Sequence, residues 1–162
     1  MPSLRHATPR DARELAHLGE RTFREAFGPM NTAENIDHHT RERYGEAIQA
    51  DEIADPRMTT LVAEADGALI GFTQLRWEAA PPCVAGNAPG EIQRLYVASE
   101  WHGRGIAQQL MEAALGLMQA RRCDVAWLGV WEHNPRAIAF YHKYGFAEVG
   151  ELPFSLGDDD QR

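Results

Sequence analysis

The 162-residue chain has few lysines, few cysteines and no long apolar run. Lys143 is its single lysine, and 16 basic residues stand against 24 acidic ones, which gives a formal net charge of −8. This balance disfavours a nucleic-acid partner, because such a partner needs a basic protein surface. An acidic surface fits a cationic small-molecule substrate, although acidity that serves only solubility is the commoner explanation.

The two cysteines, Cys83 and Cys123, show neither the spacing of a metal site nor that of a disulfide framework. They indicate free thiols in a reducing compartment, and hence a cytoplasmic location. No stretch approaches the roughly 18 to 20 apolar residues of a membrane-spanning helix, and the start lacks the apolar core of a signal peptide. We therefore expect a soluble cytoplasmic protein without a bound metal or a membrane partner.

Apolar spacing predicts strands and helices within one domain, residues 1–162. The expected strands are 4–8, 60–64, 68–77, 91–97, 125–131 and 146–155, and the expected helices are 9–28, 32–50, 106–121 and 135–144. Asp66-Gly67 is typical of a two-residue hairpin turn, and Gly145 of a helix end. The expected fold class is α/β (α+β), a mixed sheet with helices packed on it.

A glycine turn, His102-Gly103-Arg104-Gly105, joins the expected strand 91–97 to the helix that begins at Ile106. A helix start presents N–H groups without intrahelical partners, which can bind an anion. The turn is not a P-loop, because no Lys-Ser/Thr pair follows, and it lacks the third glycine of a dinucleotide fingerprint. By itself it is explained as well by ordinary turn chemistry as by a phosphate site.

Further segments carry a family resemblance. His102 to Ala107 matches the cofactor motif Arg/Gln-x-x-Gly-x-Gly/Ala, and Asn134 to Phe146 matches an Asn motif followed by Ala-x-x-Phe-Tyr-x-Lys-x-Gly-Phe. Together these segments resemble the GCN5-related N-acetyltransferase (GNAT) superfamily, and the resemblance covers almost the whole chain. Residues 127–132, Trp-Leu-Gly-Val-Trp-Glu, and the Phe154-x-Leu-Gly-Asp segment are similar to the spermine/spermidine N-acetyltransferase branch.

The resemblance implies the GNAT fold and acetyl transfer from acetyl-CoA to an amine of a small-molecule acceptor. It assigns cofactor binding to the end of the central strand, the turn, the first helical turn and the second motif: Leu95, Tyr96, Val97, His102, Gly103, Arg104, Gly105, Ile106, Ala107, Gln108, Asn134, Tyr141 and Lys143. In relatives, backbone N–H groups matching Leu95 or Val97 bind the thioester carbonyl. Asn134 has a second explanation, since it is also a good helix N-cap.

Two side chains are expected to carry the chemistry. Glu91 stands where histone-acetylating relatives have their glutamate base, and strand alternation would point it to the same face as Leu95 and Val97. It lies about 13 Å along the strand from Leu95, so we expect it to act through water. Tyr141 matches the tyrosine that is the general acid of many relatives. The alternatives are a solvent-exposed Glu91 at a strand edge and a Tyr141 that only packs in the core.

Two departures from the family pattern bear on function. His102 replaces an Arg or Gln, which removes a permanent cation and keeps a donor, and Arg104 could supply the missing charge. Relatives also continue into a final strand that this chain lacks, so we expect a sheet that is one strand short or is completed by a second copy in a homodimer. Both departures motivate an alternative function, a CoA-binding regulatory module without turnover.

The acceptor is the least determined part of the expectation. The polar helix after Thr32 overlies the acceptor site in this fold, and its acidic residues Glu34, Asp37 and Glu42 could hold a polyamine. His38 and His39 on that segment fit a solvated face better than a site. Trp127 and Trp131 fit the core better than a binding surface. A protein N-terminus, an amino acid or an antibiotic stay open as acceptors.

Overall fold

A computed structural model describes residues 2–27, 45–77, 87–129, 135–147, 154–156 and 159–161 of the chain. The strands are β1 (Ser3–His6), β2 (Met58–Ala65), β3 (Ala68–Trp77), β4 (Pro89–Val97), β5 (Val125–Trp127), β6 (Phe154–Leu156) and β7 (Asp159–Gln161). The helices are α1 (Ala12–Phe27), α3 (Glu46–Ala54), α4 (Ile106–Ala120) and α5 (Pro135–Lys143), with short 3₁₀ turns at Pro9–Asp11 and Ser99–Trp101. The mixed α/β architecture expected from the sequence is confirmed.

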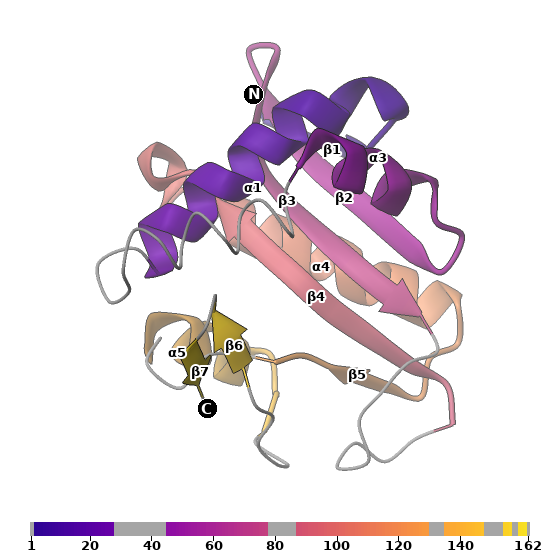
Figure 1. Cartoon of the computed structure of the whole chain (residues 1–162). Coiled ribbons are helices and arrows are strands. Elements are labelled where there is room, and N and C mark those ends of the chain that lie inside the picture. The colour runs from indigo at the N-terminus through magenta and orange to yellow at the C-terminus, as the bar shows by residue number, and fades with distance from the viewer. Residues whose placement is uncertain are drawn as a thin grey trace.

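Five strands form the central sheet in the order β1-β2-β3-β4-β5. The first four pair antiparallel, and β5 runs parallel to β4 after the crossover through α4. Helices α1 and α3 cover one face and α4 covers the other (Figure 1). The hairpin between β2 and β3 turns at Asp66 and Gly67, which both have positive φ, so the expected turn is confirmed.

The core follows the apolar periodicity of the sequence. Beneath α1, a cluster joins Leu15, Leu18 and Phe23 to Val62 and Phe72 of the sheet. Beneath α4, buried residues of the helix (Ile106, Leu110, Met111, Ala114 and Met118) pack on the opposite face. The amphipathic stripes thus determine which face of each helix meets the sheet.

Three expected elements differ in the structure. The single helix expected over 32–50 is wrong, because Gly45 is extended and caps a helix that begins at Glu46 and ends at Ala54; residues 32–44 lie outside the described residues. The expected buried strand 125–131 ends at Trp127 within the described residues, and its side chains are only half-buried. Residues 146 and 147 are not in a strand, and β6 pairs with β7 in a separate two-stranded sheet, so the single strand expected over 146–155 is wrong.

Candidate functional site

Within the described residues, the short strand β5 pairs with the start of β4. The recorded register joins Pro89, Gly90 and Glu91 to β5, whereas β4 continues to Val97 (Figure 1). Ala98 N–H donates to Ile70 O of β3 at 2.8 Å, so by antiparallel alternation the N–H groups of Leu95 and Val97 point away from β3. These two backbone donors therefore lie on the edge of β4 that the recorded pairing with β5 leaves uncovered.

The glycine turn opens α4 as expected. Gly103 and Gly105 have φ of +77° and +81°, values that glycine adopts without strain, and a Cβ at Gly103 would meet nothing within 4 Å. Gln109 N–H donates to Gly105 O at 3.1 Å, so the N–H groups of the preceding turn have no partner inside the helix. The donors and the open space beside them fit the phosphate groups of a coenzyme A.

His102 ties this turn to the end of β4. Its Nε2 lies 2.8 Å from Val97 O, and Arg136 Nη1 of α5 lies 3.3 Å from its Nδ1. Since the carbonyl can only accept and the guanidinium can only donate, the hydrogen bonds assign a neutral ring that is protonated on Nε2. The ring donor that we expected for the cofactor is used on Val97, so in this structure His102 positions the turn. The sequence analysis missed Arg136, which brings a permanent cation beside the turn.

The other cofactor residues expected from the resemblance occupy varied surroundings. Arg104 lies over the Trp101 ring, 4.9 Å from its centroid, in a cation–π contact on the surface. The Ile106 side chain is buried, so only its backbone faces the turn, and Ala107 packs beside it. Tyr96 contacts Phe72 on the α1 side of the sheet. Gln108 and Lys143 are exposed, and Asn134 lies outside the described residues.

Glu91 lies on the face of the sheet opposite α4. Its neighbour Ile92 packs beneath α4, so Glu91 points the other way. A β-bulge at Gln93, where the register shifts between Arg94 and Ile92, then returns Leu95 and Val97 to the α4 side. The expectation that Glu91 shares a face with Leu95 and Val97 is therefore wrong, because the bulge breaks strict alternation.

The carboxyl of Glu91 is half-buried. Burial raises its pKa above the usual range, and the positive charges of Arg76 and Arg94 oppose that rise. Arg76 stands directly opposite Glu91 on β3. In its ionised state such a carboxylate can accept a proton from a bound amine.

Tyr141 lies on α5 among aromatic rings at the border of the α4 core. Its ring centroid is 5.5 Å from that of Phe140 and 6.0 Å from that of Phe146. Burial raises the pKa of its phenol to about 12. Gly145 ends the helix with positive φ, as expected, and Phe146 N–H returns to Tyr141 O at 3.3 Å. This cap fixes the end of the helix that carries Tyr141.

A buried polar cluster beneath α3 went unnoticed in the sequence. Arg94 Nη1 lies 3.0 Å from Glu52 Oε1 and also donates to Gln74 Oε1. Gln74 Nε2 donates to Gln49 Oε1 at 2.9 Å, and Gln49 Nε2 donates to Glu52 Oε1 at 3.1 Å. The four side chains close a ring of hydrogen bonds, called the α3 ring below. The signals available in the sequence were Gln74 and Arg94, two polar residues that each stand beside apolar residues in their strands.

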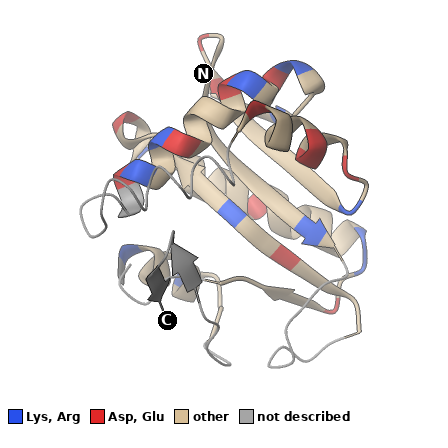
Figure 2. Ribbon diagram, viewed as in Figure 1, with Lys and Arg blue, Asp and Glu red and all other residues tan. Residues whose placement is uncertain are grey.

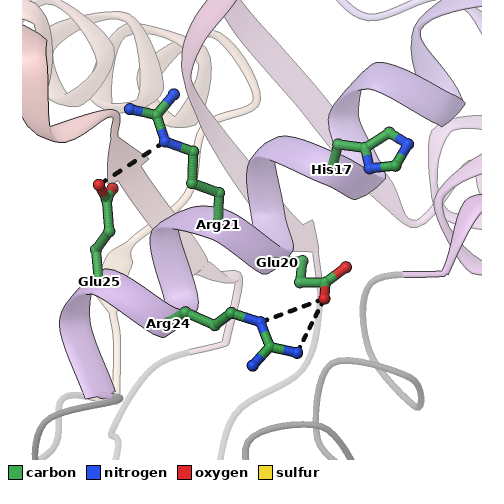
Figure 3. Close-up of a pocket in the computed structure, with 5 residues that line it drawn as sticks. All are labelled: His17, Glu20, Arg21, Arg24 and Glu25. Carbon is green, nitrogen blue, oxygen red and sulfur yellow. Dashed lines mark hydrogen bonds and ion pairs between the residues drawn. The ribbon is translucent and has the colours of Figure 1, made fainter.

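A shallow hollow of about 410 Å³ lies on the exposed side of α1 (Figure 3). Its lining consists of His17, Glu20, Arg21, Arg24 and Glu25. Arg24 pairs with Glu20 at 3.0 Å, and Arg21 lies 3.8 Å from Glu25 and hydrogen-bonds Glu100 outside the helix, so these charges are largely compensated. The hollow contains no residue of β4, the glycine turn or α5, and it is separate from the expected chemistry.

The described residues carry neither a metal-binding group nor a membrane-spanning helix. No three His, Cys, Asp or Glu side chains there are grouped so that they could hold a metal ion. Within the same ranges, no helix is long and apolar enough to cross a membrane.

Comparisons with known proteins show the family of this chain. Residues 21–146 match the acetyltransferase (GNAT) family model. An uncharacterized N-acetyltransferase of Lactobacillus delbrueckii subsp. lactis is 32% identical over 152 residues, 94% of this chain and 88% of that protein. The spermine/spermidine N(1)-acetyltransferase of Bacillus subtilis is 27% identical over 93 residues, 56% of this chain and 60% of that protein.

A solved structure agrees in fold. The PaiA N-acetyltransferase of Thermoplasma acidophilum, in complex with coenzyme A, superposes with a TM-score of 0.79 at 24% identity, over 91% of this chain and 90% of that one. The family match over residues 21–146 and the relative at 32% identity lead to one assignment. The chain therefore belongs to the acetyltransferase (GNAT) family and is an N-acetyltransferase that uses acetyl-CoA.

Proposed function

We propose that the enzyme transfers the acetyl group to a primary amine of a small cationic acceptor of the polyamine class, with Glu91 as the proton acceptor. The observation that carries the proposal is the position of Glu91. Its half-buried carboxyl lies at the last recorded pair between β4 and β5, Glu91 with Trp127, where β5 ends. A base at that point faces the side of the sheet that α3 covers.

The reaction needs a base more than any other group. An alkyl amine with a pKa of about 10.4 is neutral in only about one molecule in a few thousand at pH 7, which costs roughly 4 to 5 kcal/mol. Glu91 offsets this cost by accepting the ammonium proton. The strand spacing from Glu91 to Leu95 is too long for direct contact with an amine at the thioester, so the proton passes through water.

The amine nitrogen attacks the thioester carbon, a C–N bond forms, and the C–S bond breaks. The backbone N–H groups of Leu95 and Val97 supply the donors for the negative charge that develops on the carbonyl oxygen. Tyr141 hydrogen-bonds the departing thiolate. With its pKa at about 12, full proton transfer to a thiolate of pKa about 8.5 is uphill by about 5 kcal/mol. The phenol therefore stabilises the thiolate without giving up its proton, and solvent protonates the thiolate after release.

Two observations support a polyamine acceptor. The chain carries a formal net charge of −8, and a curated relative acts on spermine and spermidine. The groups nearest Glu91 include Arg76 and Arg94, which repel a second cation. The remaining charges of the acceptor therefore lie away from β4. Glu34, Asp37 and Glu42, outside the described residues, are our candidates to bind them.

The test measures CoA thiol release against a panel of amines at fixed acetyl-CoA. Spermidine is compared with a monoamine of similar length and with a peptide that has a free N-terminus. We expect kcat/KM for spermidine to exceed that for the monoamine by at least about tenfold, since one extra ion pair contributes on the order of 1 kcal/mol or more. Turnover of hydrophobic monoamines alone would overturn the polyamine assignment. Tight acetyl-CoA binding by calorimetry with no turnover of any amine would favour a regulatory module instead.

A further inference from the structure

The α3 ring lies beside the proposed base. Glu91 and Arg94 are on the same strand, and both face the α3 side because the bulge falls between them. The charged residues of β3 and β4 are Arg76, Glu91 and Arg94, and Figure 2 shows these charged positions on strands otherwise drawn as uncharged. Both side chains therefore lie on the α3 side of β4, where the charge of Arg94 acts on the half-buried Glu91.

The ring holds Arg94 firmly. The Arg94 side chain is 8% exposed and that of Glu52 is 15% exposed, and the Arg94 Nη1 group lies 3.0 and 3.1 Å from the two Glu52 oxygens. Gln49 and Gln74 are almost fully buried and orient both partners. A buried ion pair adds little net stability, because taking both charges out of water costs about as much as their attraction returns. Its presence beside Glu91 therefore calls for another role.

We propose that Arg94 is a positioning residue of acetyl transfer, which acts on Glu91 through its charge and is itself held in place by Glu52 of α3. The inference rests on the proposed role of Glu91 as the base. It extends the machinery from β4 to α3, a helix that the sequence placed only as a cover over the acceptor site. Arg94 supplies the attraction that keeps Glu91 ionised, and Glu52 offsets part of that attraction.

All described charges that act on Glu91 enter the test. Arg76 faces it from β3 and Arg94 from β4. Glu52 of α3 acts through Arg94, and Asp55, which follows α3, acts through Arg76. The β5 residue paired with Glu91 is the uncharged Trp127. Arg76 and Asp55 are kept unchanged in every variant.

Three variants separate charge from packing. Arg94→Gln removes the positive charge, so the acid limb of the pH dependence of kcat should move up by about 1 pH unit. Glu52→Gln removes the opposing charge with little change in shape, so the limb should move down by a smaller amount. Arg94→Lys keeps the positive charge but loses the planar guanidinium group. The acid limb of kcat should therefore stay near its wild-type pH even if the melting temperature falls. Glu64→Gln, the matched control, removes one negative charge from an ion pair with Arg5 on β1 and β2 and should leave the limb unchanged.

A direct titration accompanies the kinetics. The ¹³C signal of the Glu91 side-chain carboxyl is assigned by its loss in Glu91→Gln. The pKa that it reports should rise in Arg94→Gln and fall in Glu52→Gln, as the acid limb does. A uniform loss of kcat at all pH values, with an unmoved carboxyl titration, would show a purely structural ring and would overturn the inference.

The failure of the proposed function looks different. If the acid limb is the same in Glu91→Gln as in the wild type, Glu91 is not the base and the proposed function fails at that point. If Glu91→Gln removes the limb but the Arg94 and Glu52 variants leave it in place, Glu91 stays the base and only the inference about the α3 ring is overturned.

Discussion

The regions beneath α4 and beneath α3 are built from opposite kinds of side chain. Under α4, Leu75 and Ile92 meet Met111, Ala114 and Met118 in an apolar cluster. Under α3, the same two strands present Gln74 and Arg94, which bond to Gln49 and Glu52. Apolar burial stabilises a fold in proportion to area and has no direction. A polar ring contributes less stability but fixes the position of each charge, and here that charge lies next to Glu91.

The largest expected effect comes from the apolar region. Leu110→Ala removes a side chain that is 0% exposed, and it should lower the free energy of unfolding by about 3 to 4 kcal/mol. Urea denaturation measures the loss, and Leu117→Ala, at a half-buried position on the same helix, should cost about 1 kcal/mol. The pH dependence of kcat should not change in either variant. A shift of the acid limb of kcat in Leu110→Ala would contradict the separation of the apolar region beneath α4 from the polar region beneath α3.

Tyr141 tests whether the apolar border contributes chemistry as well as packing. Tyr141→Phe keeps the ring contacts and removes the donor to the thiolate, so kcat should fall roughly ten- to hundredfold while stability stays within about 1 kcal/mol. Because burial holds the phenol pKa at about 12, wild type and variant should show the same pH dependence between about pH 7 and 10. Tyr144→Phe is the control. A basic limb that only the wild type shows in this range would contradict a thiolate-stabilising role.

The ion pair of Arg5 with Asp11, at the edge of the sheet, serves as a comparison for the buried ion pair of the α3 ring. Asp11 accepts from Arg5 at 2.8 and 2.9 Å and from Thr8 N–H at 2.7 Å, and its pKa is lowered to about 2, mainly by the Arg5 hydrogen bonds. A carboxyl group whose pKa is lower in the folded than in the unfolded protein stabilises the fold at pH values above its unfolded pKa. This stabilisation is lost as the pH falls from about 4 towards 2.

Asp11→Asn should therefore destabilise by about 1 to 2 kcal/mol at pH 7, since solvent screens the partly exposed Arg5, and by much less near pH 2. Urea denaturation at the two pH values checks this. Asp66→Asn removes the same charge at an exposed turn position where Asn is tolerated, and it should change stability by less than about 0.5 kcal/mol. An Asp11 effect that is independent of pH would point to lost packing instead.

The smallest net effect is expected when the α3 ring is made apolar as a whole. Arg94→Met alone leaves Glu52 unpaired and should cost about 3 kcal/mol. Combined with Gln49→Leu, Glu52→Leu and Gln74→Leu, it should return to within about 1 kcal/mol of the wild type. Unfolding in urea compares the two proteins. A combined variant as unstable as the sum of its single changes would show that the ring is needed for folding.

The sequence by itself determined the fold class, the hairpin turn at Asp66-Gly67, the glycine turn before α4 and the family. The fold class and the two turns depend on local backbone preference and on short-range periodicity, which neighbouring residues decide, whereas the family rests on the resemblance of two motifs. The same information placed Glu91 and Tyr141 on the right elements.

Only the tertiary structure decided how the side chains meet. The bulge at Gln93 moved Glu91 to the face opposite Leu95, and a bulge follows from how strands fit together, which alternation along one strand cannot report. The hydrogen bond to Val97 used the donor that His102 was expected to keep. Glu52 and Arg94 meet across 42 positions of sequence, and such a contact exists only once α3 has packed on the sheet.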